Sequence, residues 1–243
     1  MKRTLILCSD GTSTIQSMDF GETYHSIDGA VQESSHVYIH CGLNYFIEHY
    51  AKKKESIDIL EIGFGTGLNA LLTVIEQQNN PLLTKCPIYY ETVELYPLDE
   101  EEWSKLNYPE KLNIRDPKKN NKKENVSEIF KTIHQCEWGV MTKIGISFNF
   151  MKIKENILNF EPTRIFDIVF FDAFSPNSQP ELWSQKIFNK IARHLHNESI
   201  LTTYSSKGDV KRALRASGFT ITRLPGVGTK RHIIRGIKNN TII

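Results

Sequence analysis

A glycine-rich segment follows a short apolar run of the sequence. Residues 57–62 (Ile-Asp-Ile-Leu-Glu-Ile) lead into Gly63, and Gly65 and Gly67 follow at alternate positions. Glycines at such a point let the backbone turn sharply and approach a ligand closely. Dinucleotide enzymes have the spacing G-x-G-x-x-G, whereas Leu68 stands where this chain would need the third glycine. The segment therefore predicts a ligand-binding loop between a strand and a helix, for a ligand other than a dinucleotide.

Polar residues at three predicted strand ends suit the parts of S-adenosylmethionine (SAM). Glu61, just before the first glycine, would repel a pyrophosphate but suits the α-ammonium group of SAM, directly or through water. Glu94 ends a second predicted strand, where a carboxylate can accept two hydrogen bonds from ribose hydroxyls; the alternative is an ordinary exposed glutamate. Asn156, after the next strand, is interpreted as a partner of the adenine amino group. SAM is therefore the expected cofactor.

A third acidic residue follows the apolar run at residues 165–171. Asp172 begins the sequence Asp-Ala-Phe-Ser-Pro, at the sheet edge where open α/β sheets bind ligands. Methyl transfer needs an aligned, unprotonated acceptor, and a carboxylate can recruit an alkyl ammonium and help to remove its proton. Phe174 is placed to pack on a flat substrate ring. The alternative is that Asp172 only caps the following helix.

The elements that position these residues alternate along the chain. Strands are expected near 57–62, 88–95, 145–153, 165–171, 199–204, 219–224 and 231–237, and helices near 66–78, 180–195 and 208–216. Such alternation implies a mostly parallel sheet with helices on both faces. We expect a Rossmann-like α/β fold of the class I SAM-dependent methyltransferase type, with seven strands in its sheet. Residues 1–50 do not fit the alternation and are expected to form a small cap on the substrate side of a single domain over 51–243.

The bulk composition is that of an ordinary globular protein. With 243 residues, of which 40% are hydrophobic and 24% charged, a sizeable core is expected. No apolar stretch is long enough for a membrane span or a signal peptide, so we expect a cytoplasmic protein without a membrane partner. The four widely spaced cysteines indicate reduced thiols, and no set of ligands predicts a metal. The sequence holds no signal for the oligomeric state.

The net charge of +2 hides a basic C-terminal stretch. Residues 207–238 contain nine Lys or Arg and one acidic residue, Asp209. Such a stretch could neutralise phosphates of a nucleic acid, and a solvated surface of mixed charge is the alternative. The candidate RNA contacts are Lys207, Lys211, Arg212, Lys230 and Arg231. The polar, lysine-rich stretch at 113–125 is expected to be a surface loop, and its lysines at 115–123 either touch RNA or face solvent.

Motifs along nearly the whole chain resemble the methyltransferase domain of the MnmC-type enzymes, which form 5-methylaminomethyl-2-thiouridine in tRNA. The stretches that carry the resemblance are 10–14 (DGTST), 20–26 (FGETYHS), 29–38 (GAVQESSHVY), 60–69 (LEIGFGTGLN), 171–176 (FDAFSP), 180–183 (PELW), 203–208 (TYSSKG) and 225–231 (PGVGTKR). A GxGxG loop alone indicates only a methyltransferase, whereas the N-terminal segment, Asp-Ala-Phe-Ser-Pro and Tyr-Ser-Ser-Lys-Gly are far more specific.

The resemblance implies SAM-dependent N-methylation of a 5-aminomethyl(-2-thio)uridine at wobble position 34 of tRNA. It also implies that Tyr24 and His25 close over the substrate, and that Gln32, Glu33 and Asn69 lie near SAM or substrate. Long family members carry an additional FAD-dependent oxidoreductase domain. This chain has no second glycine-rich strand–helix unit, so we expect methylation only, without FAD, on a substrate supplied by another enzyme.

Two other functions compete with this interpretation. An aminopropyltransferase of the spermidine synthase type shares the fold and an amine nucleophile, but typically carries a Gly-Gly-Gly-Asp-Gly loop and a second acid shortly after the catalytic aspartate. A non-catalytic RNA-binding module would need neither the glycine loop nor Glu94 and Asp172. Measurable SAM binding separates this module from both enzymes.

Overall fold

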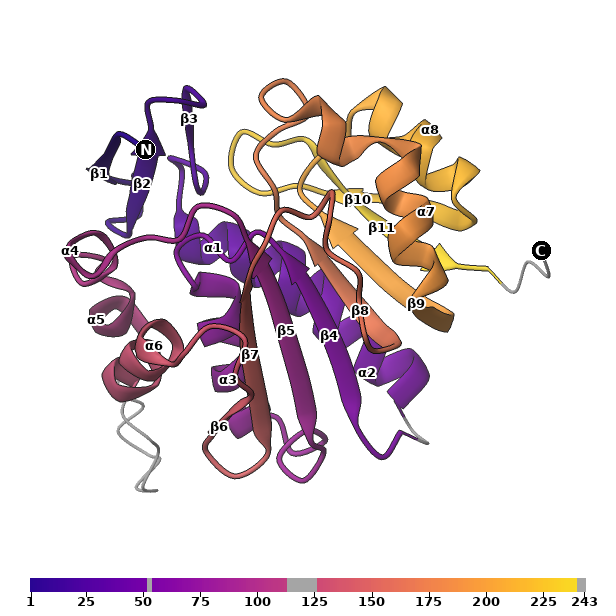
Figure 1. Cartoon of the computed structure of the whole chain (residues 1–243), viewed down its shortest axis with the longest axis horizontal. Helices are drawn as coiled ribbons and strands as arrows, with labels where there is room; N and C mark the ends of the chain where they lie inside the picture. The colour runs from indigo at the N-terminus through magenta and orange to yellow at the C-terminus, as the bar shows by residue number, and fades with distance from the viewer. Residues whose placement is uncertain (52–53, 113–125, 240–243) are drawn as a thin grey trace.

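A computed structural model describes residues 1–51, 54–112 and 126–239 of the chain, and the expected loop at 113–125 lies outside these ranges. A central sheet has the strand order β10-β11-β9-β8-β4-β5-β7-β6 (Figure 1). Its strands are β4 (Ile57–Ile62), β5 (Ile88–Glu94), β6 (Thr142–Ile144), β7 (Phe148–Lys154), β8 (Phe166–Phe171), β9 (Leu195–Thr203), β10 (Phe219–Pro225) and β11 (His232–Lys238). Strands β7, β5, β4, β8 and β9 pair in parallel, while β11 and β6 pair antiparallel with their neighbours.

The mostly parallel α/β sheet confirms the expected fold, with one difference in strand number. The sheet has eight strands where we expected seven, because the short strand β6 adds to one edge. Three residues are too few for a period of two to stand out in the sequence. The central strand β8 is buried at every position, as a strand covered on both faces requires. Its pairing with β4 sets Phe171 opposite Ile62, so Asp172 and Gly63 leave the sheet side by side.

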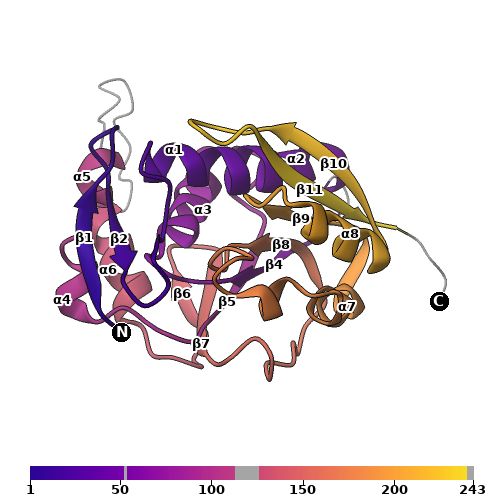
Figure 2. The same ribbon diagram turned by 90° about the horizontal axis from the view of Figure 1, so that it is seen from above.

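Helices cover both faces of the central sheet (Figure 2). The helical segment formed by α1 (Ala30–Ser34), η1 (Ser35–Asn44) and α2 (Tyr45–Tyr50) packs on one face together with α3 (Leu68–Asn79). On the other face lie η3 (Pro180–Trp183), α7 (Gln185–Arg193) and α8 (Gly208–Ala216). Alternate residues of β8 supply the two cores, with Phe170 on the first side and Phe171 on the second.

The N-terminal strands form a small separate sheet beside the central one (Figures 1 and 2). Strands β1 (Arg3–Leu7), β2 (Ser13–Ser17) and β3 (Glu22–Thr23) are antiparallel. Near them lie α4 (Glu100–Trp103), α5 (Tyr108–Leu112) and α6 (Val126–Gln135). Arg3 bonds Glu102 at 2.8 Å, and the backbone of Ser13 donates to Asn107 at 2.8 Å. The first 50 residues are thus divided, because residues 3–23 form this N-terminal sheet while residues 30–50 pack on the central sheet.

Among the helices that the structure describes, none has both the length and the apolar character that crossing a membrane would require.

Candidate active site

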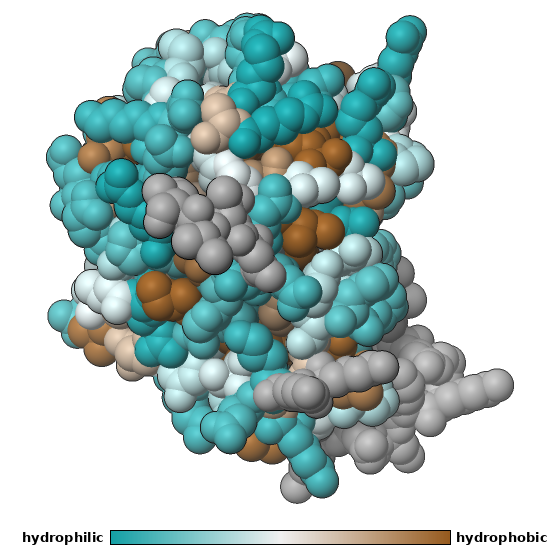
Figure 3. All heavy atoms as spheres, turned by 90° about the vertical axis from the view of Figure 1, so that its right-hand side faces the viewer, coloured by the Kyte–Doolittle hydropathy of each residue, from teal (hydrophilic) through white to brown (hydrophobic). Residues whose placement is uncertain are grey.

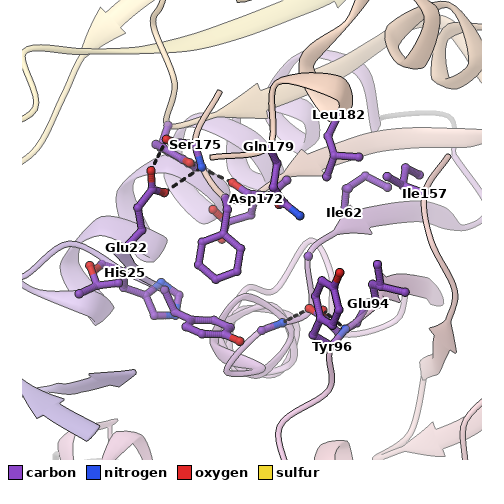
Figure 4. A pocket seen from close by; sticks show the side chains of 18 of the residues that line it. Glu22, His25, Ile62, Glu94, Tyr96, Ile157, Asp172, Ser175, Gln179 and Leu182 are labelled. Atoms are coloured by element: carbon purple, nitrogen blue, oxygen red, sulfur yellow. Dashed lines mark hydrogen bonds between the residues drawn. The ribbon is translucent and has the colours of Figure 1, made fainter. Parts of the chain in front are cut away.

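A cavity of about 540 Å³ opens between the carboxyl ends of the central strands and the N-terminal sheet (Figure 4). This volume is typical of sites that bind small molecules. Ten of the residues predicted from the sequence line it, namely Tyr24, His25, Glu33, Gly63, Gly65, Glu94, Asn156, Asp172, Phe174 and Lys230. The structure therefore brings the glycine loop, the predicted ribose partner and the predicted catalytic corner to one place.

The glycine loop adopts backbone conformations that other residues rarely reach. Gly63, Gly65 and Gly67 have φ values of +95°, +50° and +72°. A Cβ on Gly63 would lie 2.5 Å from the backbone oxygen of Asp172, so the loop passes very close to the end of β8. Gly67 is packed against the ring of His134 and shapes the start of α3 without lining the cavity. The loop leaves a cradle that side chains would fill, as binding of an extended ligand requires.

Two polar side chains are fixed on the cavity wall where SAM was expected. The Glu94 carboxylate accepts hydrogen bonds from the backbone nitrogens of Gly65 at 2.9 Å and Tyr96 at 2.7 Å (Figure 4). Each of its oxygens keeps a further lone pair for a ribose hydroxyl. The side-chain oxygen of Asn156 accepts from the backbone of Leu158 at 2.9 Å. This bond orients the Asn156 amide and leaves one acceptor position for an adenine amino group.

Asp172 is held as a carboxylate poised to exchange a proton near neutral pH. Asn69, in the first turn of α3, donates from Nδ2 to Oδ2 of Asp172 at 2.8 Å. Burial raises the pKa of Asp172 from 3.8 to about 6, against the opposing effect of hydrogen bonds from Tyr38 and Asn69. Asn69 itself does not line the cavity. Its hydrogen bond positions Asp172, and its expected place near SAM or substrate stays a prediction.

Glu61 lies beneath the glycine loop and has no exposed surface. It is off the cavity wall, and neither of its carboxyl oxygens has a hydrogen-bond partner among the described residues. Burial raises its pKa to about 8, although Thr92, Asn69 and Tyr90 lower it. An unpartnered buried carboxyl group next to the cradle fits the α-ammonium of SAM through an intervening water. The residues present thus fit SAM, and Glu61 would contact it through a water molecule.

Glu61→Gln is expected to stabilise the free protein at pH 8. The carboxyl group ionises near pH 4.5 when unperturbed, but near pH 8 in the folded protein. Below pH 4.5 both states carry the proton and folding bears no penalty. Between pH 4.5 and pH 8 only the unfolded state ionises, so stability falls as pH rises, and above pH 8 the penalty is constant. Glutamine removes a penalty on the order of 4 kcal/mol, which corresponds to a Tm higher by roughly ten degrees.

Thermal melts at pH 5 and pH 8, combined with calorimetric SAM titration, check this expectation. The gain in Tm should be large at pH 8 and small at pH 5. At pH 8, where Glu61 is partly ionised, SAM binding should weaken about tenfold because the charge opposite the ammonium is lost. A variant that melts and binds SAM like the wild type at both pH values would show that Glu61 has neither role.

Aromatic rings lie along the other wall of the cavity, where Tyr24 and Phe174 line it and Phe20 packs on Phe174 without lining the cavity itself. Phe174 stacks on Phe20 with 4.5 Å between ring centroids and meets Tyr24 edge-on at 5.0 Å. The N-terminal sheet is tied to this wall by Glu22, which accepts from the backbone of Ser175 at 2.9 Å (Figure 4). Burial, followed by the charge of Glu94, raises the pKa of Tyr24, so its hydroxyl stays neutral. Sequence reasoning missed Phe20, although it belongs to the quoted FGETYHS motif.

His25, the second residue proposed to close over the substrate, lines the cavity as a neutral ring. Its Nε2 lies 2.6 Å from the hydroxyl of Thr66, and its Nδ1 lies 3.5 Å from that of Ser34. Burial lowers the pKa of His25 to about 4. The ring is thus fixed between two hydroxyls and is a poor proton acceptor at neutral pH.

The acidic residues on the cavity wall outnumber the lysines and arginines. Among the described residues that line it, Lys230 is the only lysine or arginine. The acidic residues are Glu22, Glu33, Glu94, Glu155, Asp172 and Glu181. Such a cavity favours cationic ligands.

The remaining predicted residues lie outside the cavity. Gln32 is exposed, whereas its neighbour Glu33 is buried and lines the cavity, so the interpretation of Gln32 as a SAM contact is not supported by its placement. Lys207 donates to Asn177, in the loop that follows Asp172. Arg212 pairs with Asp209 on α8, while Lys211 is half-buried on the same helix and Arg231 is exposed. The face over α7 and α8 is largely hydrophilic (Figure 3).

A glycine cradle with acidic residues at the carboxyl edge of this sheet defines a SAM-dependent methyltransferase, and comparison with known proteins agrees. The profile of a family described as S-adenosyl-L-methionine-dependent methyltransferase matches residues 116–239, and the chain belongs to this family.

Named relatives narrow the resemblance further. The tRNA 5-methylaminomethyl-2-thiouridine biosynthesis bifunctional protein MnmC of Azoarcus sp. (strain BH72) is 28% identical over 96% of this chain and 35% of its own length. The protein of the same name from Nitrosospira multiformis is 30% identical over 91% of this chain and 35% of its own length. The chain thus spans about a third of these relatives. The crystal structure of MNMC2 from Aquifex aeolicus superposes over the whole chain and 72% of its own, with a TM-score of 0.75 and 22% identity. The resemblance drawn from the motifs is confirmed.

Proposed function

We propose that this chain methylates the amine of 5-aminomethyl(-2-thio)uridine at wobble position 34 of tRNA, with SAM as the methyl donor. One observation carries the proposal: Asp172, with a pKa of about 6, lines the same cavity as the glycine loop and Glu94. A carboxylate of this kind suits an amine that arrives protonated and must react unprotonated. The substrate is inferred from the names of the relatives, which refer to tRNA 5-methylaminomethyl-2-thiouridine biosynthesis.

In the proposed reaction each wall of the cavity has its own task. Gly63, Gly65 and Glu94 would hold the methionine and ribose parts of SAM, and Asn156 the adenine. SAM supplies an activated methyl group, which leaves the sulfonium as the amine nitrogen forms the new bond. Asp172 orients the amine by accepting its hydrogen bond and takes up its surplus proton. Phe174, supported by Phe20, would stack on the uracil ring. This chemistry needs neither flavin nor metal.

The tRNA would enter from the N-terminal sheet and the loop after β8. We propose that residues 3–23 form the cap over the substrate, because Glu22 of this sheet and Tyr24, which directly follows it, line the cavity. Lys207 and Arg231 are the proposed phosphate contacts beside the cavity, with Lys211 and Arg212 on α8 as outer contacts. Each such contact should add to the salt dependence of tRNA binding. A tRNA substrate also implies action in the cytoplasm.

The aminopropyltransferase alternative keeps one argument in its favour. The cavity is acidic, as a polyamine site would be. The basic C-terminal stretch contributes only Lys230 to its wall, so this stretch does not exclude a polyamine substrate. Membership of the methyltransferase family and the named relatives favour methyl transfer. A polyamine must therefore stand among the controls of the decisive experiment.

Transfer of radiolabelled methyl from SAM to tRNA carrying 5-aminomethyluridine tests the proposal. Unmodified tRNA and putrescine serve as acceptor controls. We expect label in the wobble nucleoside alone, identified after digestion of the tRNA. Absence of label on this tRNA, in a protein that binds SAM, would refute the proposed substrate.

A further inference from the structure

A lysine and a glutamate that are far apart in the sequence meet on the cavity wall. The Nζ of Lys230 forms an ion pair with Glu33, and the same Nζ lies 4.2 Å from the centre of the Tyr204 ring. The Glu33 side chain is 8% exposed and that of Lys230 is 33% exposed. All three residues line the cavity. An alkyl ammonium group is therefore bound here by a carboxylate and an aromatic face, a combination that suits such cations in general.

The anionic residue of this group, Glu33, and its aromatic residue, Tyr204, are both fixed in place. The second oxygen of Glu33 accepts from the backbone nitrogen of Ser26 at 2.6 Å. The hydroxyl of Tyr204 donates to the backbone oxygen of Ala173 at 2.9 Å, directly beside Asp172. The ammonium subsite is thus built from the first turn of α1 and the end of β9, next to the proposed catalytic carboxylate.

The cationic member is attached more loosely. Lys230 reaches the site on a long side chain from the turn that joins β10 to β11. That turn is tied down one residue earlier, where the backbone nitrogen of Thr229 donates to Asp28 at 2.7 Å. The Lys230 side chain can therefore swing away by rotation of its own bonds while the turn stays in place. Another alkyl ammonium could replace it without any change of charge at the subsite.

Electrostatics connect the pair to the catalytic corner. Besides burial and its hydrogen bonds, Asp172 senses both members of the pair, since Glu33 raises and Lys230 lowers its pKa. If Lys230 left with no cation in its place, Glu33 would be an unpaired buried charge, which is costly. Exchange of one ammonium for another avoids that cost.

We infer that Glu33 and Tyr204 form the subsite that recognises the protonated aminomethyl group of the substrate, and that this group displaces Lys230 from Glu33. The inference rests on the proposed function, which supplies the ammonium. Glu33 and Tyr204 then select for a cationic wobble substituent, and Asp172 prepares the selected amine for methylation. Lys230 is accordingly an exchangeable counterion of Glu33, and its contact with phosphate, expected from the sequence, is not needed.

Binding of two tRNAs that differ only at the wobble base separates this subsite from the rest of the interface. One carries 5-aminomethyluridine and the other uridine, and their Kd values are compared at pH 7. The wild type should prefer the aminomethyl tRNA, and Glu33→Gln should lose about tenfold of that preference. The amide oxygen can still accept from Ser26, so SAM affinity, measured in parallel, should be kept. Lys230→Gln should preserve or widen the preference. Glu48→Gln, exposed on α2, and Lys186→Gln, exposed on α7, are the matched controls.

The outcomes distinguish the subsite from the reaction. A wild type that methylates the aminomethyl tRNA, with a Glu33→Gln variant that keeps the full preference, would overturn the subsite alone. The Lys230→Gln variant could instead lose the same factor of affinity for both tRNAs, with a slope of log K against log salt concentration that is smaller by about one. That result would make Lys230 a phosphate contact and overturn the proposed displacement of Lys230 by the substrate. Failure of the wild type to methylate or to prefer this tRNA would overturn the proposed function and the inference together.

Discussion

Asp172→Asn is expected to slow methyl transfer by about 10²- to 10⁴-fold, the range contributed by a positioned proton acceptor. Asparagine keeps the size of the side chain and an oxygen that can accept the hydrogen bond from Asn69, but it loses the charge and the basicity. SAM affinity should therefore change by less than about threefold, because the cradle of Gly63 and Gly65 is untouched. Single-turnover transfer to 5-aminomethyluridine tRNA and calorimetric SAM binding measure the two quantities.

The pH profile links this loss to the carboxylate itself. Burial moves the pKa of Asp172 from 3.8 to about 6, and the reaction uses the unprotonated form. The kcat/KM of the wild type should thus fall about tenfold per pH unit below pH 6, and Asp172→Asn should lack this limb. Asp19→Asn, an exposed residue of the N-terminal sheet's turn, should behave like the wild type. Asp172→Asn turnover near the wild-type rate would exclude the carboxylate as proton acceptor.

The strands that carry the site could be predicted because they are continuous apolar runs that end at informative residues. Residues 57–62 and 165–171 were expected as strands, and β4 and β8 occupy 57–62 and 166–171. Parallel strands in register place their following residues together, so Gly63 and Asp172 had to meet once the strands were neighbours. That these two strands are neighbours could not be derived from the spacing of apolar residues, because this spacing does not state the strand order.

The helical segment at residues 30–50 could not be predicted, because its buried side does not look like the apolar face of a helix. Gly42 sits on that side, where an added Cβ would lie 3.1 Å from the ring of Phe170 and 3.2 Å from the hydroxyl of Thr202. Glycine is needed here for close approach of helix and sheet, yet it lowers helix propensity. Because the helix was not predicted, the residues of this segment that face the central sheet could not be predicted either. Gln32 and Glu33 were therefore both expected near SAM or substrate, and of the two only Glu33 lines the cavity.

The basic C-terminal stretch shows why counts of charge do not map a binding surface. Several of its members are engaged within the fold. The Arg235 guanidinium lies 3.2 Å from the centre of the Tyr45 ring, and Lys238 donates to the backbone of Leu195 at 3.0 Å. Lys230 reaches Glu33, 197 positions away in the sequence. Partners so far apart in the sequence leave no pattern near the residue itself. The tertiary structure is therefore needed to tell the lysines and arginines that are bound within the fold from those that can bind a ligand.

Gly63→Ala is expected to reduce SAM affinity at least 100-fold and to destabilise the protein by about 2–4 kcal/mol. The new Cβ would lie 2.5 Å from the backbone oxygen of Asp172 at a φ of +95°, so either the glycine loop or the end of β8 must move. Both segments form walls of the cavity. The overlap with the new Cβ cannot be relieved by a side-chain rotation, because the contacted oxygen of Asp172 belongs to the backbone. Calorimetric SAM titration and thermal unfolding give the two values.

Gly139→Ala separates the crowding from the backbone strain. Gly139 has a φ of +79°, but an added Cβ would meet nothing within 4 Å. This variant should therefore lose only about 1 kcal/mol, the cost of a left-handed non-glycine residue, and should bind SAM like the wild type. If Gly63→Ala bound SAM equally well, the close approach of the loop to β8 would not be what shapes the cradle. Because Gly139 matches the strain and lacks the contact, a large difference in stability between the two variants assigns the extra destabilisation of Gly63→Ala to that single contact.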